Sequence, residues 1–224
     1  FEQHIEDTLI AGDGICDEKI VNMVVKDAPA RLQELIDWGT QFDKNSDGNY
    51  SLGREGGHSQ DRVLHHKDIT GAEIERALIQ QVENTENITF LTYHYAIDLI
   101  TEHQLKQKPI KRKEKITCFG AYVLDEKKNI VKTFSAKVTM LATGGNGQVY
   151  NTTTNPVIAT GDGIAMAYRA KAEISDVEFI QFHPTALYNP GEYPAFLISE
   201  AVRGEGAILR GFNGERFMHK YDER

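Results

Sequence analysis

The spacing of apolar residues predicts helices near the beginning of the chain. Between residues 5 and 38, apolar side chains recur three and four positions apart, as at Ile5 and Leu9. This period places the side chains on one face of an amphipathic helix, and Gly14 and Pro29 are the expected breaks. We therefore expect two or three helices in this region.

A polar loop and a further helix are expected next. Residues 39–50 are polar and contain Asp47-Gly48, a strong signal for a tight turn. Thr70 is followed by Glu73 at the spacing of a capping box, and the apolar residues after it keep a helical period. The pattern predicts a helix that begins at Thr70.

The pattern then changes to short strands. Segments 88–91, 96–101 and 117–124 alternate or run apolar, residues 125–129 have the composition of a turn, and 130–134 reads as a returning strand. Together they predict a small antiparallel meander. The apolar run 138–141, which ends in small residues, predicts a buried parallel strand.

The last third of the chain changes in texture. Gly161-Asp-Gly163 is expected to open a helix that runs to Ala170. Beyond about Val177 the sequence becomes rich in prolines, aromatic residues and polar residues. We therefore expect a boundary between a domain of residues 1–176 and a second one of residues 177–224.

Composition narrows the class of protein. The 224 residues are 40% hydrophobic, enough for a folded core, and carry 25 lysines and arginines against 33 acidic residues, a net charge of −8. Such a balance argues against nucleic-acid binding and against anionic membranes. The basic run 106–115 is expected to be a solvated hairpin tip.

Cysteine usage points to a reducing compartment, and hydropathy argues against membrane insertion. Cys16 and Cys118 lie far apart, without neighbours at metal-ligand spacing, so neither a metal site nor a disulfide framework is expected. The sequence has no apolar stretch of about 18 residues and no signal-peptide pattern. We expect a cytoplasmic protein that does not insert into membranes.

Two short motifs could contact a nucleotide cofactor. Thr143-Gly144-Gly145 follows the apolar run, and glycines there would let the backbone approach a diphosphate closely, although glycine pairs also end strands simply to turn. Asp162, between two glycines, could accept hydrogen bonds from sugar hydroxyls or could cap its own helix. The chain contains no complete Gly-x-Gly-x-x-Gly fingerprint.

A second polar cluster could bind an anionic substrate. His183 precedes a proline, which fixes its backbone, and it shares this part of the sequence with Gln181, Ser199 and Arg203. Glu200 lies three residues before Arg203, so on a helix the two could form either a proton route or a solvated ion pair. A histidine beside aromatic residues is also often a core residue.

The charged residues of the glycine-rich segment 53–59 form another candidate site. This segment reads Gly-Arg-Glu-Gly-Gly-His-Ser, so Arg54 and Glu55 are flanked by glycines on both sides. The pattern fits side chains on a tight loop at a cleft, or equally a flexible exposed loop.

These motifs together resemble, in order, the succinate dehydrogenase and fumarate reductase flavoprotein family over nearly the whole chain. The matching segments are 53–59, 64–71, 142–145, 160–167, 178–188, 203–206 and 214–218. The loop 53–59 and the segment 5–16 resemble the branch that oxidises L-aspartate in particular. The resemblance implies an α/β fold: a partial FAD-binding domain of glutathione-reductase type with an inserted β-meander, followed by the start of an α+β capping domain.

The resemblance also implies an activity and partners. The implied enzyme uses FAD to oxidise L-aspartate to iminoaspartate, and oxygen or fumarate reoxidises the flavin. Its product would feed quinolinate synthase in de novo NAD biosynthesis, so this synthase is an expected pathway partner.

By position in the motifs, the resemblance assigns roles to individual residues. Glu55 would bind the substrate ammonium, and a substrate carboxylate would be held by Gln181, His183 and Ser199, where relatives more often have threonine than serine. Glu200 and Arg203 would relay protons. FAD would be contacted by Ala96, Ile97, Thr143, Gly144, Gly145 and Asp162.

The family's FAD fingerprint, central catalytic arginine and remaining substrate ligands have no counterpart in this sequence. We therefore expect the chain to be the middle of an enzyme that, on its own, binds FAD weakly or not at all and does not turn over aspartate. Two alternatives stay open at this point. One is a fumarate reductase or succinate dehydrogenase flavoprotein, and the other is a non-catalytic binding or assembly module.

Overall fold

The structure is a computed structural model that describes residues 1–55, 58–107, 115–183, 185–199, 202 and 206–221. The chain divides into two compact units. The first comprises Phe1–Phe90 with Ser199–Arg224, and the second comprises Leu91–Ile198. The domain boundary expected between residues 176 and 177 stays a prediction.

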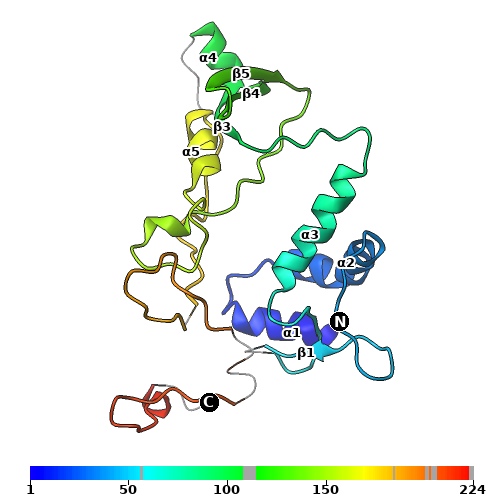
Figure 1. Cartoon of the computed structure of the whole chain (residues 1–224), viewed down its shortest axis with the longest axis vertical. Helices are drawn as coiled ribbons and strands as arrows, with labels where there is room; N and C mark the ends of the chain where they lie inside the picture. Colours follow the sequence, from blue (N-terminus) through cyan, green and yellow to red (C-terminus); the bar gives the residue numbers. More distant parts are fainter. Residues whose placement is uncertain (56–57, 108–114, 184, 200–201, 203–205, 222–224) are drawn as a thin grey trace. The chain divides into compact units, whose positions relative to one another are not determined.

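The first unit contains three longer helices: α1 (Glu2–Ala11), α2 (Glu18–Asp37) and α3 (Thr70–Glu83) (Figure 1). The side chain of Asp17 caps α2 by accepting hydrogen bonds from the backbone N–H groups of Lys19 (2.9 Å) and Ile20 (3.2 Å). The expected number of helices before residue 38 is confirmed. The expected break at Pro29 is wrong, because Pro29 lies inside α2.

The continuity of α2 through Pro29 has a physical reason. A proline removes one backbone hydrogen bond from a helix interior, which is a local cost. Packing can offset that cost, and α2 contacts both α1 and α3 and buries Val25. The sequence pattern at Pro29 therefore reports the local cost but not the tertiary contacts.

The start of α3 is confirmed at Thr70, but its predicted capping box does not form. The N-cap residue is Ile69, whose side chain makes no capping hydrogen bond. The hydroxyl of Thr70 accepts a hydrogen bond from the backbone N–H of His66 (3.1 Å). The buried carboxylate of Glu73 instead accepts from the backbone of Gln41 (2.8 Å) and from the guanidinium of Arg76 (2.7 Å). These contacts tie α3 to the loop that follows α2.

A small hairpin completes the described part of the first unit before α3. Strands β1 (Leu52–Gly53) and β2 (Val63–Leu64) pair in antiparallel register, with Leu52 opposite Leu64. The predicted turn before it is confirmed, since Gly48 has a φ of 82° between the bridged residues Lys44 and Tyr50. A 3₁₀ turn, η2 (Met218–Lys220), lies near the end of the chain.

The second unit is built on an antiparallel sheet. Its strands β3 (His94–Thr101), β4 (Cys118–Asp125) and β5 (Ile130–Ser135) are ordered β3-β4-β5, which confirms three of the four strands of the predicted meander. The short helix α4 (Glu102–Lys106) follows β3, and the expected hairpin tip at 106–115 lies mostly outside the described residues. The 3₁₀ turn η1 (Gly147–Val149) and helix α5 (Asp162–Arg169) come later.

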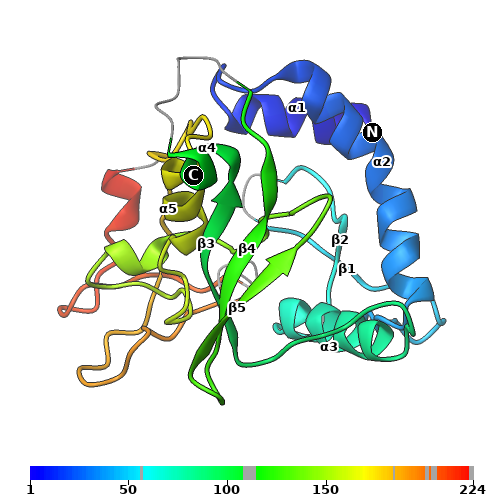
Figure 2. The ribbon, with the colours of Figure 1, turned by 90° about the horizontal axis from the view of Figure 1, so that it is seen from above.

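Helix α5 packs on β3 and forms the core of this unit. Leu99 of β3 is buried with Met166 and Ala170, and Ala96, Cys118 and Ala121 pack against them. Figures 1 and 2 both show α5 alongside β3. The helix predicted at Gly161–Ala170 is therefore confirmed within one residue at each end.

Two predicted strands are absent from the described structure. Residues 88–91 form a loop, and residues 138–141 are extended without strand pairing. Val138 is 82% exposed and Met140 is 85% exposed, so the predicted buried strand is wrong for this chain. A parallel strand is buried by neighbouring strands and helices, and no described strand pairs with this segment.

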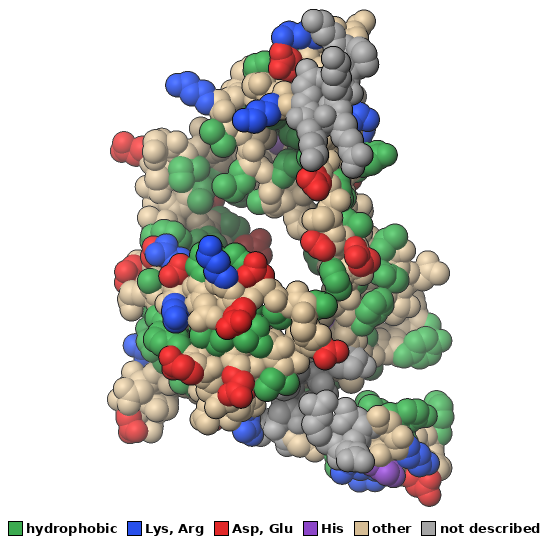
Figure 3. All heavy atoms as spheres, turned by 180° about the vertical axis from the view of Figure 1, so that it is seen from behind, with side chains coloured by type: hydrophobic (Ala, Val, Ile, Leu, Met, Phe, Trp, Pro, Cys, Tyr) green, Lys and Arg blue, Asp and Glu red, His purple; other side chains and the backbone are tan. Residues whose placement is uncertain are grey.

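The described surface carries charges of both signs. On the face drawn in Figure 3, lysine and arginine side chains are interspersed with aspartate and glutamate side chains. No helix in the described part of the chain combines the length and apolarity needed to cross a membrane.

Candidate functional site

The beginning of α5 packs directly on the segment that contains the glycine pair. The carbonyl of Gly145 accepts a hydrogen bond from the backbone N–H of Gly161 (3.2 Å). A Cβ atom added to Gly163 would lie 1.8 Å from Oγ1 of Thr143. Gly161 has a φ of 77°, and an added Cβ would lie 2.9 Å from Cβ of Asn146. Both glycines are therefore required by close packing within the unit.

The glycine pair itself has a different environment. A Cβ added to Gly144 or to Gly145 would meet nothing within 4 Å. Gly144 has a φ of 72°, which favours glycine, whereas no such backbone reason exists for Gly145. The described contacts of the chain thus do not explain Gly145, and the open space beside it suits a ligand that approaches the backbone.

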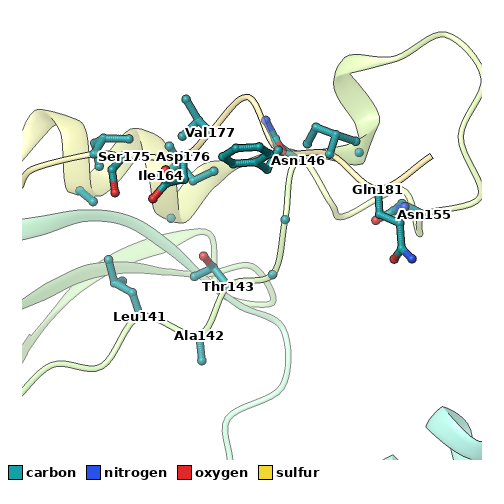
Figure 4. Close-up of a pocket in the computed structure, with 18 of the residues that line it drawn as sticks. Leu141, Ala142, Thr143, Asn146, Asn155, Ile164, Ser175, Asp176, Val177 and Gln181 are labelled. Carbon is teal, nitrogen blue, oxygen red and sulfur yellow. The ribbon is translucent and has the colours of Figure 1, made fainter. Parts of the chain in front are cut away.

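A cavity of about 770 Å³ lies beside this segment. Its walls come from residues 141–147, from α5 and from residues 173–181, including Gln181. Figure 4 shows Ala142 and Thr143 on one side of the cavity and Ile164, Asp176 and Val177 on the other, with Gln181 and Asn155 at one end of the view. The volume falls within the range usual for small-molecule and cofactor sites.

Asp162 lies at the first position of α5 and is held by a hydroxyl group of its own loop. The hydroxyl of Thr160 donates to its Oδ2 (2.6 Å). Interaction with this carboxylate, together with partial burial, raises the pKa of Tyr95 of β3 above its ordinary value. Asp162 is thus held by its own loop and interacts with Tyr95 of β3.

Ala96 and Ile97 lie on the same strand, at a bulge. The β3–β4 register shifts between Ala96 and Asp98, so Ile97 is the extra residue. The guanidinium of Arg169 donates to the carbonyl of Ile97 (3.1 Å) and to the carboxylate of Asp98 (2.9 Å). The bulge is therefore fastened to the last turn of α5, and the side chain of Ala96 packs in the core.

These contacts bring the six predicted cofactor residues into one region of the second unit. Thr143 lies against Gly163, Gly145 bonds to Gly161, and β3 reaches both ends of α5 through Tyr95 and Arg169. The segments come from positions about 95–98, 143–145 and 161–169 of the sequence. Their roles toward a cofactor remain predictions.

The predicted substrate residues Gln181 and His183 also lie in the second unit. Gln181 is exposed and lines the cavity. Nδ1 of His183, which is half-buried, lies 3.0 Å from the carbonyl oxygen and 3.3 Å from the backbone nitrogen of Thr185. When Nδ1 accepts the N–H of Thr185, the imidazole proton is on Nε2 and can be donated to a carboxylate.

The other predicted site residues belong to the first unit or lie outside the described residues. Glu55 is exposed on the loop between β1 and β2, and half-buried Ser199 is where the chain returns to the first unit. Glu200 and Arg203, the predicted proton-relay pair, lie outside the described residues. The described structure brings together the cofactor candidates with Gln181, and the meeting of the remaining substrate residues stays a prediction.

Sequence reasoning missed the residues that hold these candidates in place. Tyr95, Asp98 and Arg169 support the region around α5, and Asp7 and Arg62 support the Glu55 loop. Their partners are far apart in the sequence, up to 71 positions for Asp98 and Arg169, so no local spacing announces them. Within the described ranges, no group of three or more metal-ligating side chains is assembled.

The residues around the cavity fit a flavin nucleotide by their chemistry. Gly144 and Gly145 leave backbone groups open to approach, and Asp162, next to the lining residue Gly163, supplies a carboxylate that could accept hydrogen bonds from sugar hydroxyls. Two of the walls are apolar at Leu141 and Ile164. A nucleotide cofactor needs this combination of open backbone, polar anchor and apolar surface.

Known proteins resemble the whole chain. Residues 1–224 match the family described as FAD binding domain. A curated L-aspartate oxidase of rice (Oryza sativa subsp. japonica), described as chloroplastic, is 48% identical over 100% of this chain and 35% of its own length. The L-aspartate oxidase of Vibrio cholerae is 47% identical over 100% of this chain and 42% of its own length.

Solved structures resemble the chain as well. A variant E. coli quinol fumarate reductase has a TM-score of 0.83 at 29% identity, over 98% of this chain and 35% of its own. A quinol-fumarate reductase with menaquinol molecules has a TM-score of 0.85 at 30% identity, over 99% of this chain and 36% of its own. The chain thus spans well under half the length of the proteins it matches.

The sequence match, the fold and the glycine-lined cavity all indicate the same family. The chain belongs to the FAD binding domain family, among flavoproteins of the succinate dehydrogenase and fumarate reductase type, and these matches indicate FAD as its cofactor.

Proposed function

We propose that the protein to which this chain belongs oxidises L-aspartate to iminoaspartate, with FAD as the electron acceptor and with oxygen or fumarate reoxidising the flavin. The observation that carries the proposal is the 48% identity to a curated L-aspartate oxidase across the full 224-residue chain. When bound, FAD would accept the two electrons of the Cα–H bond of aspartate, which breaks as the amino group loses a proton and the C=N bond of the imine forms. The protein's residues would bind, orient and deprotonate the substrate.

In this proposal the cofactor is held in the second unit. Thr143, Gly144 and Gly145 would contact FAD along the open side of their segment, and Asp162 would hold a hydroxyl group. The backbone of Ala96 and Ile97 would contact the nucleotide. Support comes from the anchoring of Asp162 by Thr160 and from the bulge at Ile97, which removes that residue from the regular β3–β4 pairing.

The substrate would be recognised by opposite charges and hydrogen bonds. The carboxylate of Glu55 would pair with the ammonium group of aspartate, which fumarate and succinate lack. Gln181, His183 and Ser199 would donate hydrogen bonds to a substrate carboxylate. Glu200 and Arg203 would carry a proton away from the substrate, since a fixed carboxylate–guanidinium pair can form a hydrogen-bonded route.

The isolated 224-residue chain is expected to bind FAD weakly or not at all and to have no activity. Quinolinate synthase would consume the unstable imine product, as part of de novo NAD biosynthesis. We place the protein in the cytoplasm on its cysteine usage, although plant relatives are named as chloroplastic.

A second candidate function is fumarate reduction or succinate oxidation by a flavoprotein subunit. The observation that favours it is the likeness to solved quinol fumarate reductases, with a TM-score of 0.85. The two functions differ at the amino group of the substrate, so Glu55 separates them. An enzyme that acts only on fumarate and succinate has no need for a carboxylate at that position.

The experiment is Glu55→Gln in the full-length protein, with steady-state kinetics for aspartate oxidation and for fumarate reduction. A hydrogen bond to a charged group contributes about 1.5–3 kcal/mol, so we expect its loss to raise the KM for aspartate roughly 10- to 100-fold. Fumarate reduction should change little. The proposal fails if the wild-type protein does not oxidise aspartate, and the role of Glu55 fails if both reactions weaken equally.

A further inference from the structure

The loop that carries Glu55 is closed by very little regular structure. It connects β1 to β2, which pair only at Leu52 with Leu64 and at Gly53 with Val63. The backbone N–H of Arg62 adds one hydrogen bond to the carbonyl of Gly53 (3.0 Å). A two-stranded hairpin of this size is marginal in water, so other contacts must order the loop.

Helix α1 supplies those contacts through one side chain. Oδ2 of Asp7 accepts hydrogen bonds from the backbone N–H of Ser59 (3.1 Å), from the hydroxyl of Ser59 (2.8 Å) and from the guanidinium of Arg62 (2.6 Å). The side chains of Asp7 and Arg62 are only 10% and 16% exposed. A partly buried carboxylate with three donors, one of them cationic, makes a strong contact.

Neighbouring contacts strengthen this attachment. The amide of Gln3 donates to the other oxygen of Asp7 (3.2 Å). The rings of His4 and His58 pack edge to face, with their centroids 6.3 Å apart. On the loop, the backbone N–H of His58 donates to the carbonyl of Glu55 (3.1 Å). A short path of contacts therefore leads from α1 through Ser59 and His58 to the backbone of Glu55.

We propose that Asp7 is a positioning residue for Glu55: it fastens the loop between β1 and β2 to α1 and so sets the place of the Glu55 carboxylate. This inference rests on the proposed function for its meaning, because Glu55 is the residue proposed to recognise the substrate ammonium. It predicts that selectivity for an amino-bearing dicarboxylate depends on a side chain that does not touch the substrate.

The charge of Asp7 is the property that matters. The Ser59 backbone and hydroxyl, followed by Arg62, hold the pKa of Asp7 well below its usual range, so the carboxylate is ionised at neutral pH. Asp7→Asn keeps the size of the side chain but removes the charge. It also replaces one of the two acceptor oxygens with an NH₂ group, which is itself a donor. The one oxygen that remains is a weaker acceptor than a carboxylate oxygen.

The test compares Asp7→Asn with a matched control in the full-length protein. Glu6→Gln removes one negative charge from the adjacent position of the same helix, where the side chain is exposed. Hydrogen exchange of the amide groups of residues 58–62 is measured for both variants and the wild type, without substrate. We expect exchange roughly tenfold faster in Asp7→Asn, since opening the loop no longer breaks charge-assisted bonds, and no change in Glu6→Gln.

Kinetics then separate positioning from general stability. Asp7→Asn is expected to raise the KM for aspartate by about tenfold while the kinetic constants for fumarate reduction stay within about twofold, because only aspartate uses Glu55. In Glu55→Gln, adding Asp7→Asn should have little further effect on the KM for aspartate. A general loss of folding would lower both reactions together.

The outcomes are distinct. Unchanged loop exchange in Asp7→Asn overturns the inference, as do equal losses in aspartate and fumarate kinetics with a fully additive double variant. If the wild type does not oxidise aspartate, the proposed function fails. The exchange measurement still decides whether Asp7 orders the loop, since it requires no turnover.

Discussion

Gly163→Ala tests whether α5 must lie in direct contact with the segment that contains the glycine pair. The new Cβ would lie 1.8 Å from Oγ1, 2.9 Å from Cβ and 3.1 Å from Cγ2 of Thr143. Rotation of the Thr143 side chain can move Oγ1 and Cγ2 but not Cβ, so the helix or the segment must shift. Overpacking of this kind costs about 1–3 kcal/mol, and the better helix propensity of alanine offsets up to about 1 kcal/mol.

We therefore expect a net loss of about 1–2 kcal/mol, with a fall in the melting temperature of roughly 2–4 °C per kcal/mol for a chain of this size. The affinity for FAD should fall as well, because the shift moves the backbone of residues 143–145. Thermal unfolding of the 224-residue chain measures the first effect, and titration of the full-length apoprotein with FAD measures the second. Thr143→Ala in the same protein should recover part of the loss, since it removes two of the three close atoms.

The matched control is Gly71→Ala. Gly71 is the second residue of α3, as Gly163 is the second residue of α5, and a Cβ added there meets nothing within 4 Å. This variant should be neutral or slightly more stable, by up to about 1 kcal/mol. The reasoning is refuted if Gly163→Ala behaves like Gly71→Ala, or if Thr143→Ala fails to compensate.

Two further predictions concern pH and the support of Asp162. Hydrogen bonds from Arg76 and from the backbone of Gln41 lower the pKa of Glu73 from 4.5 to about 2, so its contribution to stability is present above pH 4.5 and is lost as the pH falls toward 2. Glu73→Gln should flatten the acid limb of a plot of melting temperature against pH, whereas Glu75→Gln, at an exposed position of α3, should not. Tyr95 has a pKa raised above 10.0 by its bond to Asp162, so this contribution is present below pH 10 and is lost as the pH rises further. Tyr95→Phe should lower stability slightly at neutral pH and remove that part of the alkaline decline, and a decline identical to that of the wild type would contradict the assignment.

Local patterns predicted the parts of the fold that depend on local interactions. The meander β3–β4–β5 and helix α5 were predicted because alternation, turn residues and helical spacing are each contained within a few residues. Pro29 inside α2 was mispredicted because helix packing outweighs one missing hydrogen bond. The segment 138–141 was mispredicted because its apolar composition says nothing about whether partner strands are supplied by the same chain.

In the candidate site, too, local patterns identified some residues and missed those that depend on contacts distant in the sequence. Gly144, Gly145 and Asp162 could be singled out from the sequence, since glycines and a carboxylate beside a helix start have known uses. Asp7, Arg62, Asp98 and Arg169 could not, because each pairs with a residue that is 55 or 71 positions away. The resemblance to the flavoprotein family named residues that contact ligands, and the structure adds the residues that hold them in place.

The central claim is that this chain forms part of the FAD site of an enzyme that oxidises L-aspartate. The most direct measurement is the visible absorbance of the flavin in the full-length protein, recorded without oxygen before and after L-aspartate is added. The account predicts that FAD co-purifies with the protein, that aspartate bleaches its absorbance, and that fumarate restores it. Bound flavin that aspartate leaves oxidised while succinate bleaches it would contradict the claim.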